Sequence, residues 1–217
     1  MLALSRVLSV FALLLLRRDW LDLRDDLAKT LRAHLSAPRS SPPVLAQQLL
    51  ISGEDHRFFR HGGVDPIAIC RAIWRGIIVG QREGASTIEM QVIRVVSGRF
   101  ERTLSRKVRE TALATLVSRE IPKEALPGVY LRIGYFGWRM NGFDGACRRL
   151  GLSAEALTPA QTAALVARLK YPQPRVPSPE RWDKINTRAR YLLRLHARHT
   201  HDRTYAGLPV EPRYETA

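Results

Sequence analysis

The positions of proline constrain this 217-residue chain most, because proline is accepted in the first turn of a helix and disrupts a helix interior. Ser41, Asp65 and Thr158 each stand directly before a proline, and all three are residue types that cap helices well. They predict helix starts near residues 42, 66 and 159, and Pro122 predicts the end of a helix before it. No segment alternates apolar and polar residues as strands do, and no repeat is found. The chain is therefore predicted to be mainly α.

The spacing of apolar residues extends this prediction along the chain. We expect helices over about 19–37, 42–60, 66–80, 102–120, 124–133, 153–157, 159–169 and 180–198. Loops are expected at three segments rich in glycine, proline or polar residues, namely 81–86, 134–145 and 171–177. In the helix over 102–120 we expect the core-facing side to consist of apolar or small residues, which are Leu104, Val108, Ala112 and Thr115.

The length of the chain fits one domain with its own core, which we expect over residues 44–198. Before it we expect a hydrophobic anchor (1–18) and a stalk or linker (19–43), and after it a disordered tail (199–217). The uninterrupted apolar run of the anchor spans only ten residues, short of the roughly 20 that cross a bilayer, and no A-x-A-like cleavage site comes after it. We interpret it as a short or N-terminally truncated signal anchor. A buried helix is the alternative, and the arginines directly after the run fit poorly with export of the remaining chain.

Charge and cysteine content narrow the choice of partner and compartment. The net charge of +15 favours an anionic partner, although codon usage alone accounts for part of an arginine excess. Nucleic acid, an acidic membrane surface and a pyrophosphate-bearing substrate all meet this requirement. Cys70 and Cys147 match no metal-binding or redox spacing, so we expect two buried free thiols. A disulfide is the alternative in an oxidising compartment.

The segment over 54–63 places two acidic residues ahead of an aromatic residue and a histidine. Glu54 lies one helical turn before Phe58, and a carboxylate partly desolvated by aromatic surface suits general-base work. The alternative is that Glu54 and Asp55 are solvated charges that balance neighbouring arginines. The complete pattern, E-D-x-x-F-x-x-H-x-G, ends in His61 and a glycine and is matched at every fixed position, which favours a functional site.

The segment over 84–91 combines small residues with hydroxyls. Its small residues let backbone amides approach an anion, and Ser86 and Thr87 add side-chain donors, with Gln91 one turn further on. The simpler interpretation is a helix cap at Ser86, with Glu89 completing a capping box. The two interpretations are compatible.

The segment over 106–110 adds positive charge beside a third carboxylate. Arg106 and Lys107 precede Glu110, and helical spacing places Lys107 and Glu110 on the same side of a helix. A lysine kept in so arginine-rich a chain hints at a compact charge for a phosphate. Arg94 and Arg102, on neighbouring turns upstream, extend the cationic cluster. The alternative is an exposed Lys–Glu pair worth a few tenths of a kcal/mol.

In this order and spacing the three segments resemble the first three signature motifs of the peptidoglycan glycosyltransferases, glycosyltransferase family 51. The second motif is usually written G-G-S-T-I-x-x-Q. The fourth, K-x-x-I-L-E-x-Y-L-N, is matched less well, because residues 123–132 have Gly128 for the glutamate and Arg132 for the asparagine. Pro127 also falls inside the expected helix, at a cost of about 3 kcal/mol or more. Arg188 loosely fits the fifth motif, so the resemblance spans roughly 45–193.

The resemblance implies a mainly α, lysozyme-like glycosyltransferase domain with a small jaw subdomain near the membrane, roughly 60–100, preceded by the hydrophobic N-terminal segment. It implies a monofunctional, inverting polymerase that transfers the growing lipid-linked chain to the GlcNAc 4-hydroxyl of lipid II and releases undecaprenyl pyrophosphate. Its partners would be lipid II, the nascent glycan strand, the membrane, and cell-wall synthesis or division proteins, with no nucleic acid. The enzyme would sit at the bacterial inner membrane with its catalytic domain on the periplasmic face.

Carried over position by position, Glu54 is the general base, and Glu110 holds Lys107 or assists catalysis, directly or through a divalent cation such as Mg²⁺ or Mn²⁺. No cofactor follows with certainty, and no metal-ligand set is identified. The expected substrate-binding residues are Asp55, Phe58, His61, Ser86, Thr87, Gln91, Arg94, Arg102, Arg106 and Lys107.

Three other functions fit parts of the sequence. Gly128 and Arg132 suggest a catalytically impaired relative that binds lipid II or glycan as a scaffold. Paired acids on a lysozyme-like fold would permit a peptidoglycan hydrolase, which gives no reason for the cations over 106–107. The positive charge alone suggests a nucleic-acid binder, but no recognisable motif supports it.

Overall fold

The computed structural model describes residues 10, 13–36, 42–80 and 84–208. Its α-helices are α2 (Arg17–Leu35), α3 (Val44–Glu54), α4 (Pro66–Ile78), α5 (Ile88–Val96), α6 (Leu104–Glu120), α7 (Leu126–Ile133), α8 (Phe143–Leu150), α9 (Pro159–Lys170) and α10 (Pro179–His201). Short 3₁₀ helices are η1 (Phe58–Arg60), η2 (Lys123–Ala125) and η3 (Ala154–Ala156), and one small antiparallel sheet pairs β1 (Tyr135–Gly137) with β2 (Met140–Asn141). The prediction of a mainly α fold is confirmed.

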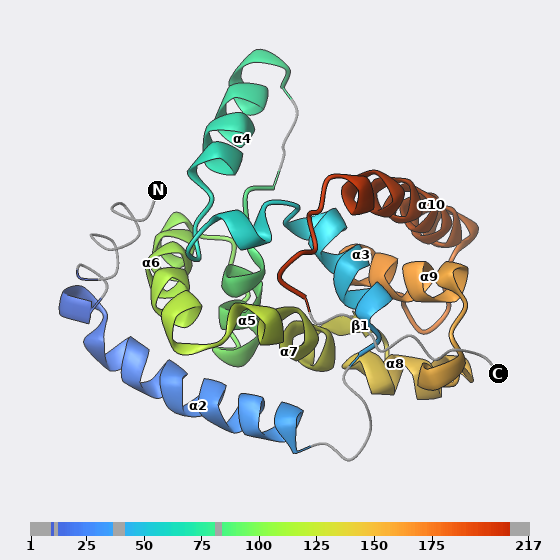
Figure 1. The fold of residues 1–217 in the computed structure, drawn as a ribbon, viewed down its shortest axis with the longest axis horizontal. Helices are drawn as coiled ribbons and strands as arrows, with labels where there is room; N and C mark the ends of the chain where they lie inside the picture. The colour runs from blue at the N-terminus through green and yellow to red at the C-terminus, as the bar shows by residue number, and fades with distance from the viewer. Residues whose placement is uncertain (1–9, 11–12, 37–41, 81–83, 209–217) are drawn as a thin grey trace.

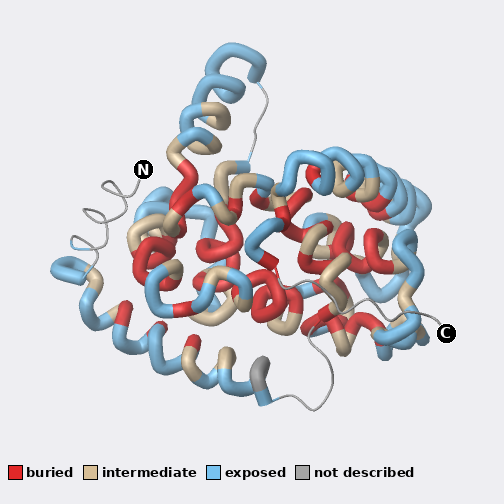
Figure 2. Tube along the Cα trace, in the orientation of Figure 1, coloured by how far each residue is buried: buried red, intermediate tan, exposed pale blue. Residues whose placement is uncertain are grey.

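The core lies where α3, α5, α7 and α9 meet (Figure 1). α6 packs on α5, and α10 lies along α9 and α3. Buried residues concentrate in this centre, whereas the outer sides of α2, α4 and α10 are exposed (Figure 2). Two of the predicted caps start helices as expected, because Asp65 and Thr158 each accept a backbone hydrogen bond from the first turn. Ser41 lies outside the described residues, and α3 begins after Pro43.

Helix α2 is part of the domain rather than a stalk. Trp20, Leu23 and Leu27 are buried at 7%, 3% and 2% exposure and face α5 and α7. Two ion pairs attach the helix to α6: Arg109 to Asp19 at 2.8 Å and Arg24 to Glu120 at 2.9 Å. The expected boundary at residue 44 is therefore wrong for this helix. Most of the expected anchor lies outside the described residues, and α2 begins at its last two positions.

Helix α4 projects from the body of the molecule (Figure 1). None of its residues is buried, and Ile73, Trp74, Ile77 and Ile78 are all more than half exposed. The helix lies within the range 60–100 expected for a jaw, and the jaw itself stays a prediction. The range 60–100 is too wide for it, however, because α5 lies within that range and buries every residue from Ile88 to Ile93.

Helix α6 buries only the C-terminal half of the face expected, where Thr115 is fully buried and Ala112 is half-buried. Leu104 and Val108 are 85% and 68% exposed, whereas Leu113 and Val117 are fully buried. The cause is length: α5 has nine residues and α6 has 17, so α5 covers only part of its neighbour. The spacing of apolar residues predicts which residues share a face of α6, but it does not predict where the neighbouring helix α5 ends.

Pro127 does not break a helix. The 3₁₀ turn η2 precedes α7, and Pro127 is the second residue of α7, where its missing N–H costs no hydrogen bond. The expected disruption therefore does not occur.

The segment expected as a glycine-rich turn contains the small sheet and α8. The strands are three and two residues long, too short for alternation to show. Gly142, at φ +72°, makes the turn into α8, and a Cβ there would lie 2.1 Å from the Arg132 carbonyl oxygen. Only glycine fits this turn.

The end of the described chain is ordered. α10 runs to His201, and Tyr205 and Leu208 are buried, so the expected disordered tail is wrong for residues 199–208. Residues 209–217 lie outside the described part. Both cysteines are free thiols as expected, but Cys70 is exposed and only Cys147 is buried. No helix in the described part of the chain is both long and apolar enough to cross a bilayer.

Candidate active site

A cavity of about 680 Å³ opens between α4, α5, α9, α10 and the end of α3. Its described lining contains one carboxylate, that of Glu54, and five cationic side chains, which are Arg71, Arg75, Arg94, Lys170 and Arg188. Helices distant in sequence supply these charges, so the fold brings them together around a single acid. Such a cavity suits a ligand with concentrated negative charge.

Glu54 is the last residue of α3, and its side chain is 25% exposed. Arg188 donates to Oε1 of Glu54 at 3.0 Å and to the Gly53 carbonyl at 2.7 Å, while Gln91 donates to Oε2 of Glu54 at 3.4 Å. The carboxylate is thus held between α5 and α10 while remaining accessible.

Phe58 does not line the cavity beside Glu54, where it was expected to desolvate the carboxylate. Phe58 is fully buried, with Lys123 Nζ 4.1 Å from its ring centroid. The described lining of the cavity contains two tyrosines instead, Tyr130 on α7 and Tyr191 on α10. Burial raises the pKa of the Tyr130 phenol, and the negative charge of Glu54 adds to this, so the hydroxyl remains a neutral hydrogen-bond donor.

Asp55 and His61 are buried beside the cavity rather than in its lining. Both oxygens of Asp55 lie 3.0 Å from His61 Nε2, and Oδ2 also accepts the Ile88 backbone N–H at 3.2 Å. Thr87 accepts from the Met90 backbone N–H and donates to the Gly63 carbonyl at 2.8 Å. These bonds join the loop after α3 to the start of α5 and position Glu54.

The second predicted segment divides between the cavity and the core. Ser86 and Gln91 line the cavity. The helix cap is Thr87, not Ser86, and no capping box forms, because Glu89 is fully buried in an ion pair with Lys123.

Glu110 is buried between two arginines. Arg94 donates to it at 3.1 Å through Nε and at 2.9 Å through Nη2, and Arg106 contacts Oε1. The hydrogen bond from Arg94 to Glu110 raises the pKa of the Arg94 guanidinium. The expected pairing of Glu110 with Lys107 is not found, and Lys107 is exposed. Of the predicted cationic cluster only Arg94 reaches the cavity, whereas Arg106 and Lys107, together with the exposed Arg102, lie outside its lining.

Several residues of the lining were not predicted from the sequence. Arg71 and Arg75 are one turn apart on α4, a spacing that could have indicated a shared face. Lys170, at the end of α9, and His56 gave no signal in the sequence. His56 stacks on His199 with ring centroids 5.7 Å apart, and burial lowers the pKa of both imidazoles.

Comparisons with known proteins find one matching family and several similar proteins. The model of a family described as "Transglycosylase" matches residues 26–196. Penicillin-binding protein 1A of Escherichia coli (strain K12) is 35% identical over 133 residues, covering 60% of this chain and 16% of that protein. Penicillin-binding protein 1A of Rickettsia felis is 33% identical over 162 residues (72% and 20%), and penicillin-binding protein 1F of Bacillus subtilis is 32% identical over 132 residues (60% and 18%). The chain thus spans at most about a fifth of the length of these relatives.

Proposed function

Because the chain belongs to the transglycosylase family of peptidoglycan glycosyltransferases, we propose that it polymerises lipid II into glycan strands. The growing lipid-linked strand is transferred to the GlcNAc 4-hydroxyl of lipid II, and undecaprenyl pyrophosphate is released. The observation that carries the proposal is the single carboxylate of Glu54 among five cations in the 680 Å³ cavity.

In this proposal Glu54 is the general base. It accepts the proton of the 4-hydroxyl as that oxygen attacks C1 of the terminal MurNAc of the donor strand, and a β-1,4 bond forms with inversion. Arg188 and Gln91 fix the carboxylate in place through their bonds to its two oxygens.

The departing pyrophosphate requires positive charge that is already in position, since electrostatic preorganisation is usually the largest contribution to catalysis. Arg94 meets this requirement at the cavity wall. Glu110 is then a positioning residue, because its carboxylate holds the Arg94 guanidinium through two hydrogen bonds. This replaces the expected role of Glu110 as a partner of Lys107.

A lipid-linked substrate also needs an apolar approach to the cavity. α4 carries Arg71 and Arg75 in the cavity lining and exposes large apolar side chains that include Trp74 and Ile77. This combination supports contact of α4 with a membrane surface. From the family of the chain we propose the bacterial inner membrane, with the catalytic domain on its periplasmic face.

The test is glycan-strand synthesis from labelled lipid II in detergent. We compare the unmodified chain with Glu54→Gln, and use the exposed Glu124→Gln as a matched control. The proposal predicts polymer from the unmodified chain and from the control, and a loss of at least about 100-fold for Glu54→Gln.

The same assay, combined with a measurement of lipid II binding, distinguishes the polymerase from a second candidate function, a scaffold that binds lipid II. Gly128 and Arg132 replace the glutamate and the asparagine of the fourth family motif, which favours a scaffold that binds lipid II without polymerising it. Arg132 forms an ion pair, with its Nη1 3.6 Å from Oδ2 of Asp144. Binding by the unmodified chain without polymer would establish the scaffold and overturn the proposed polymerase.

A further inference from the structure

Two histidines form a stacked pair in the wall of the cavity. The rings of His56 and His199 have their centroids 5.7 Å apart and an angle of 18° between their planes, and both residues line the 680 Å³ cavity that contains Glu54. His56 follows α3, and His199 lies in the last turn of α10. His56 occupies a variable position of the pattern E-D-x-x-F, and His199 lies beyond residue 196, where the match to the family ends. The pair is therefore a feature of this chain rather than of the family motifs.

Buried polar contacts hold the ring of His199 in place. Its Nδ1 lies 3.1 Å from Oγ of Ser52, and this oxygen also contacts the hydroxyl of Tyr205. Ser52, Tyr205 and His199 are only 4%, 8% and 9% exposed. Ser52 lies on α3 two residues before Glu54, so the same helix end carries the carboxylate and anchors the stacked pair. Groups that are fixed before a ligand arrives lose little conformational freedom when they bind it.

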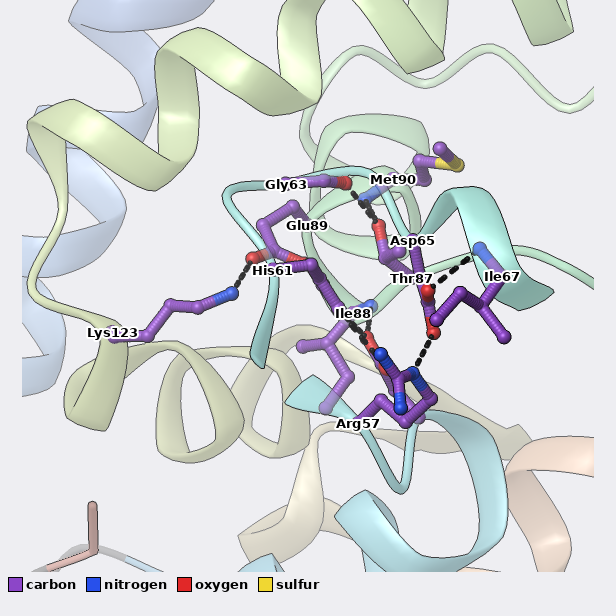
Figure 3. Close-up of polar contacts among 11 residues, drawn as sticks. Arg57, His61, Gly63, Asp65, Ile67, Thr87, Ile88, Glu89, Met90 and Lys123 are labelled. Atoms are coloured by element: carbon purple, nitrogen blue, oxygen red, sulfur yellow. Dashed lines mark hydrogen bonds and ion pairs between the residues drawn. The ribbon is translucent and has the colours of Figure 1, made fainter. Parts of the chain in front are cut away.

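The carboxylates near His56 are engaged by other side chains. Asp65 accepts a hydrogen bond from Nε of Arg57 at 3.0 Å (Figure 3). Both oxygens of Asp55 lie 3.0 Å from the buried imidazole described above. Neither His56 nor His199 forms an ion pair with a carboxylate in the described part of the chain. A proton taken up by the pair would therefore find its counter-ion in a bound anion.

The charged surroundings keep both rings neutral while no anion is bound. Burial lowers the pKa of His56, and the positive charge of Arg71 on α4 lowers it further. Burial also lowers the pKa of His199, as does the neighbouring His56. The other titratable or charged groups that act on the two rings are Asp55, Arg57, Asp65, His196, Arg198 and Asp202.

We propose that the His56–His199 pair binds a phosphate group of the lipid-linked diphosphate and takes up a proton as it does so. The class of ligand comes from the proposed function, on which this inference rests. A phosphate in the cavity offsets the charge of Arg71 and stabilises a protonated imidazole, which donates hydrogen bonds from its ring nitrogens. Proton uptake and phosphate binding then favour each other by linkage.

The affinity for the diphosphate should therefore depend on pH in a defined direction. The pKa of the imidazoles is low in the free protein and higher in the complex. Affinity is lowest at a pH above both values, rises as the pH falls through the pKa of the complex, and becomes constant below that of the free protein. A tenfold gain in affinity corresponds to a pKa that is about one unit higher in the complex.

The experiment measures the binding of fluorescently labelled lipid II in detergent at about pH 8 and about pH 6. Every protein carries Glu54→Gln, which blocks turnover under the proposed mechanism and removes the titratable carboxylate of the cavity lining. The diphosphate of lipid II is esterified at both ends and keeps its charge over this range. We expect the dissociation constant to be roughly three- to tenfold lower at the lower pH.

Histidine variants assign this pH dependence to the stacked pair. Adding both His56→Gln and His199→Gln should reduce the change to less than about 1.5-fold. His201→Gln, at an exposed position outside the cavity lining, should leave the change intact. Because His56 is exposed, His56→Gln alone gives the same comparison if replacement of the buried His199 impairs folding, and it should reduce the change.

Binding that is equal at the two pH values would overturn the proposal. A pH dependence that is the same with and without the two histidines would also overturn it, because other groups would then take up the proton. The fate of the proposed function is separate: pH-dependent binding through the histidines, without polymer from the unmodified chain, would overturn the polymerase and support the proton-linked pair. Absence of lipid II binding at both pH values would overturn both.

Discussion

The packing of α2 on the domain can be tested with two leucines of the same helix. Leu27 is 2% exposed against α5 and α7, whereas Leu21 is 46% exposed. Truncating a buried leucine to alanine costs the transfer free energy of the removed atoms plus that of the cavity left behind, typically 2–5 kcal/mol. We expect Leu27→Ala to lower the free energy of unfolding by about 2–4 kcal/mol and Leu21→Ala by less than about 0.5 kcal/mol.

For a chain of this length each kcal/mol shifts the Tm by roughly 2–4 °C. Leu27→Ala should therefore melt roughly 5–15 °C below the unmodified chain, measured by circular dichroism, and urea titration should show the same order of stability. If α2 were a solvated stalk, Leu27→Ala and Leu21→Ala would have the same Tm. A difference of less than about 1 °C between them would refute the packing described here.

Three further predictions concern the site and its surroundings. Glu110→Gln should lower polymerisation by roughly tenfold or more and destabilise the fold, because two arginines lose their buried counter-ion; glycan synthesis and urea unfolding measure the two effects. Cys147 is buried with its pKa raised by burial to about 11, so iodoacetamide should modify the exposed Cys70 first, as peptide mass spectrometry can show. Burial lowers the pKa of His56, His196 and His199, so these side chains take up protons more readily in the unfolded chain. The free energy of unfolding should therefore fall as the pH drops below about 6.5, which urea titrations at a series of pH values measure.

Local signals in the sequence predicted much of the helical structure. Asp65 and Thr158 cap the helices that the prolines after them begin, and the segment 171–177 is free of helix as expected. These predictions succeed because capping and proline geometry depend on a few consecutive residues. Glu54 was singled out from a pattern of ten consecutive positions, and it does line the cavity, while its role as general base stays a prediction.

The errors occur where distant segments decide the outcome. Helical spacing showed that α2 has an apolar stripe but not that α5 and α7 cover it. It also did not show that the N-terminal half of the predicted α6 face is exposed. Pro127 was misjudged because the 3₁₀ turn before it moves the start of α7.

The charge distribution of the site was only partly predictable for the same reason. Lys107 comes directly after Arg106 and lies one turn before Glu110, yet Glu110 pairs with Arg94 from another helix. The cations Arg71 and Lys170 reach the cavity only through the packing of α4 and α9, which no local pattern specifies.

The most direct test of the central claim is the release of undecaprenyl pyrophosphate from lipid II. One molecule should be released for each disaccharide that the unmodified chain adds to a strand, and release by Glu54→Gln should stay near background. Equal release by both proteins would contradict the assignment of Glu54, and consumption of lipid II without any glycan strand would contradict polymerisation itself.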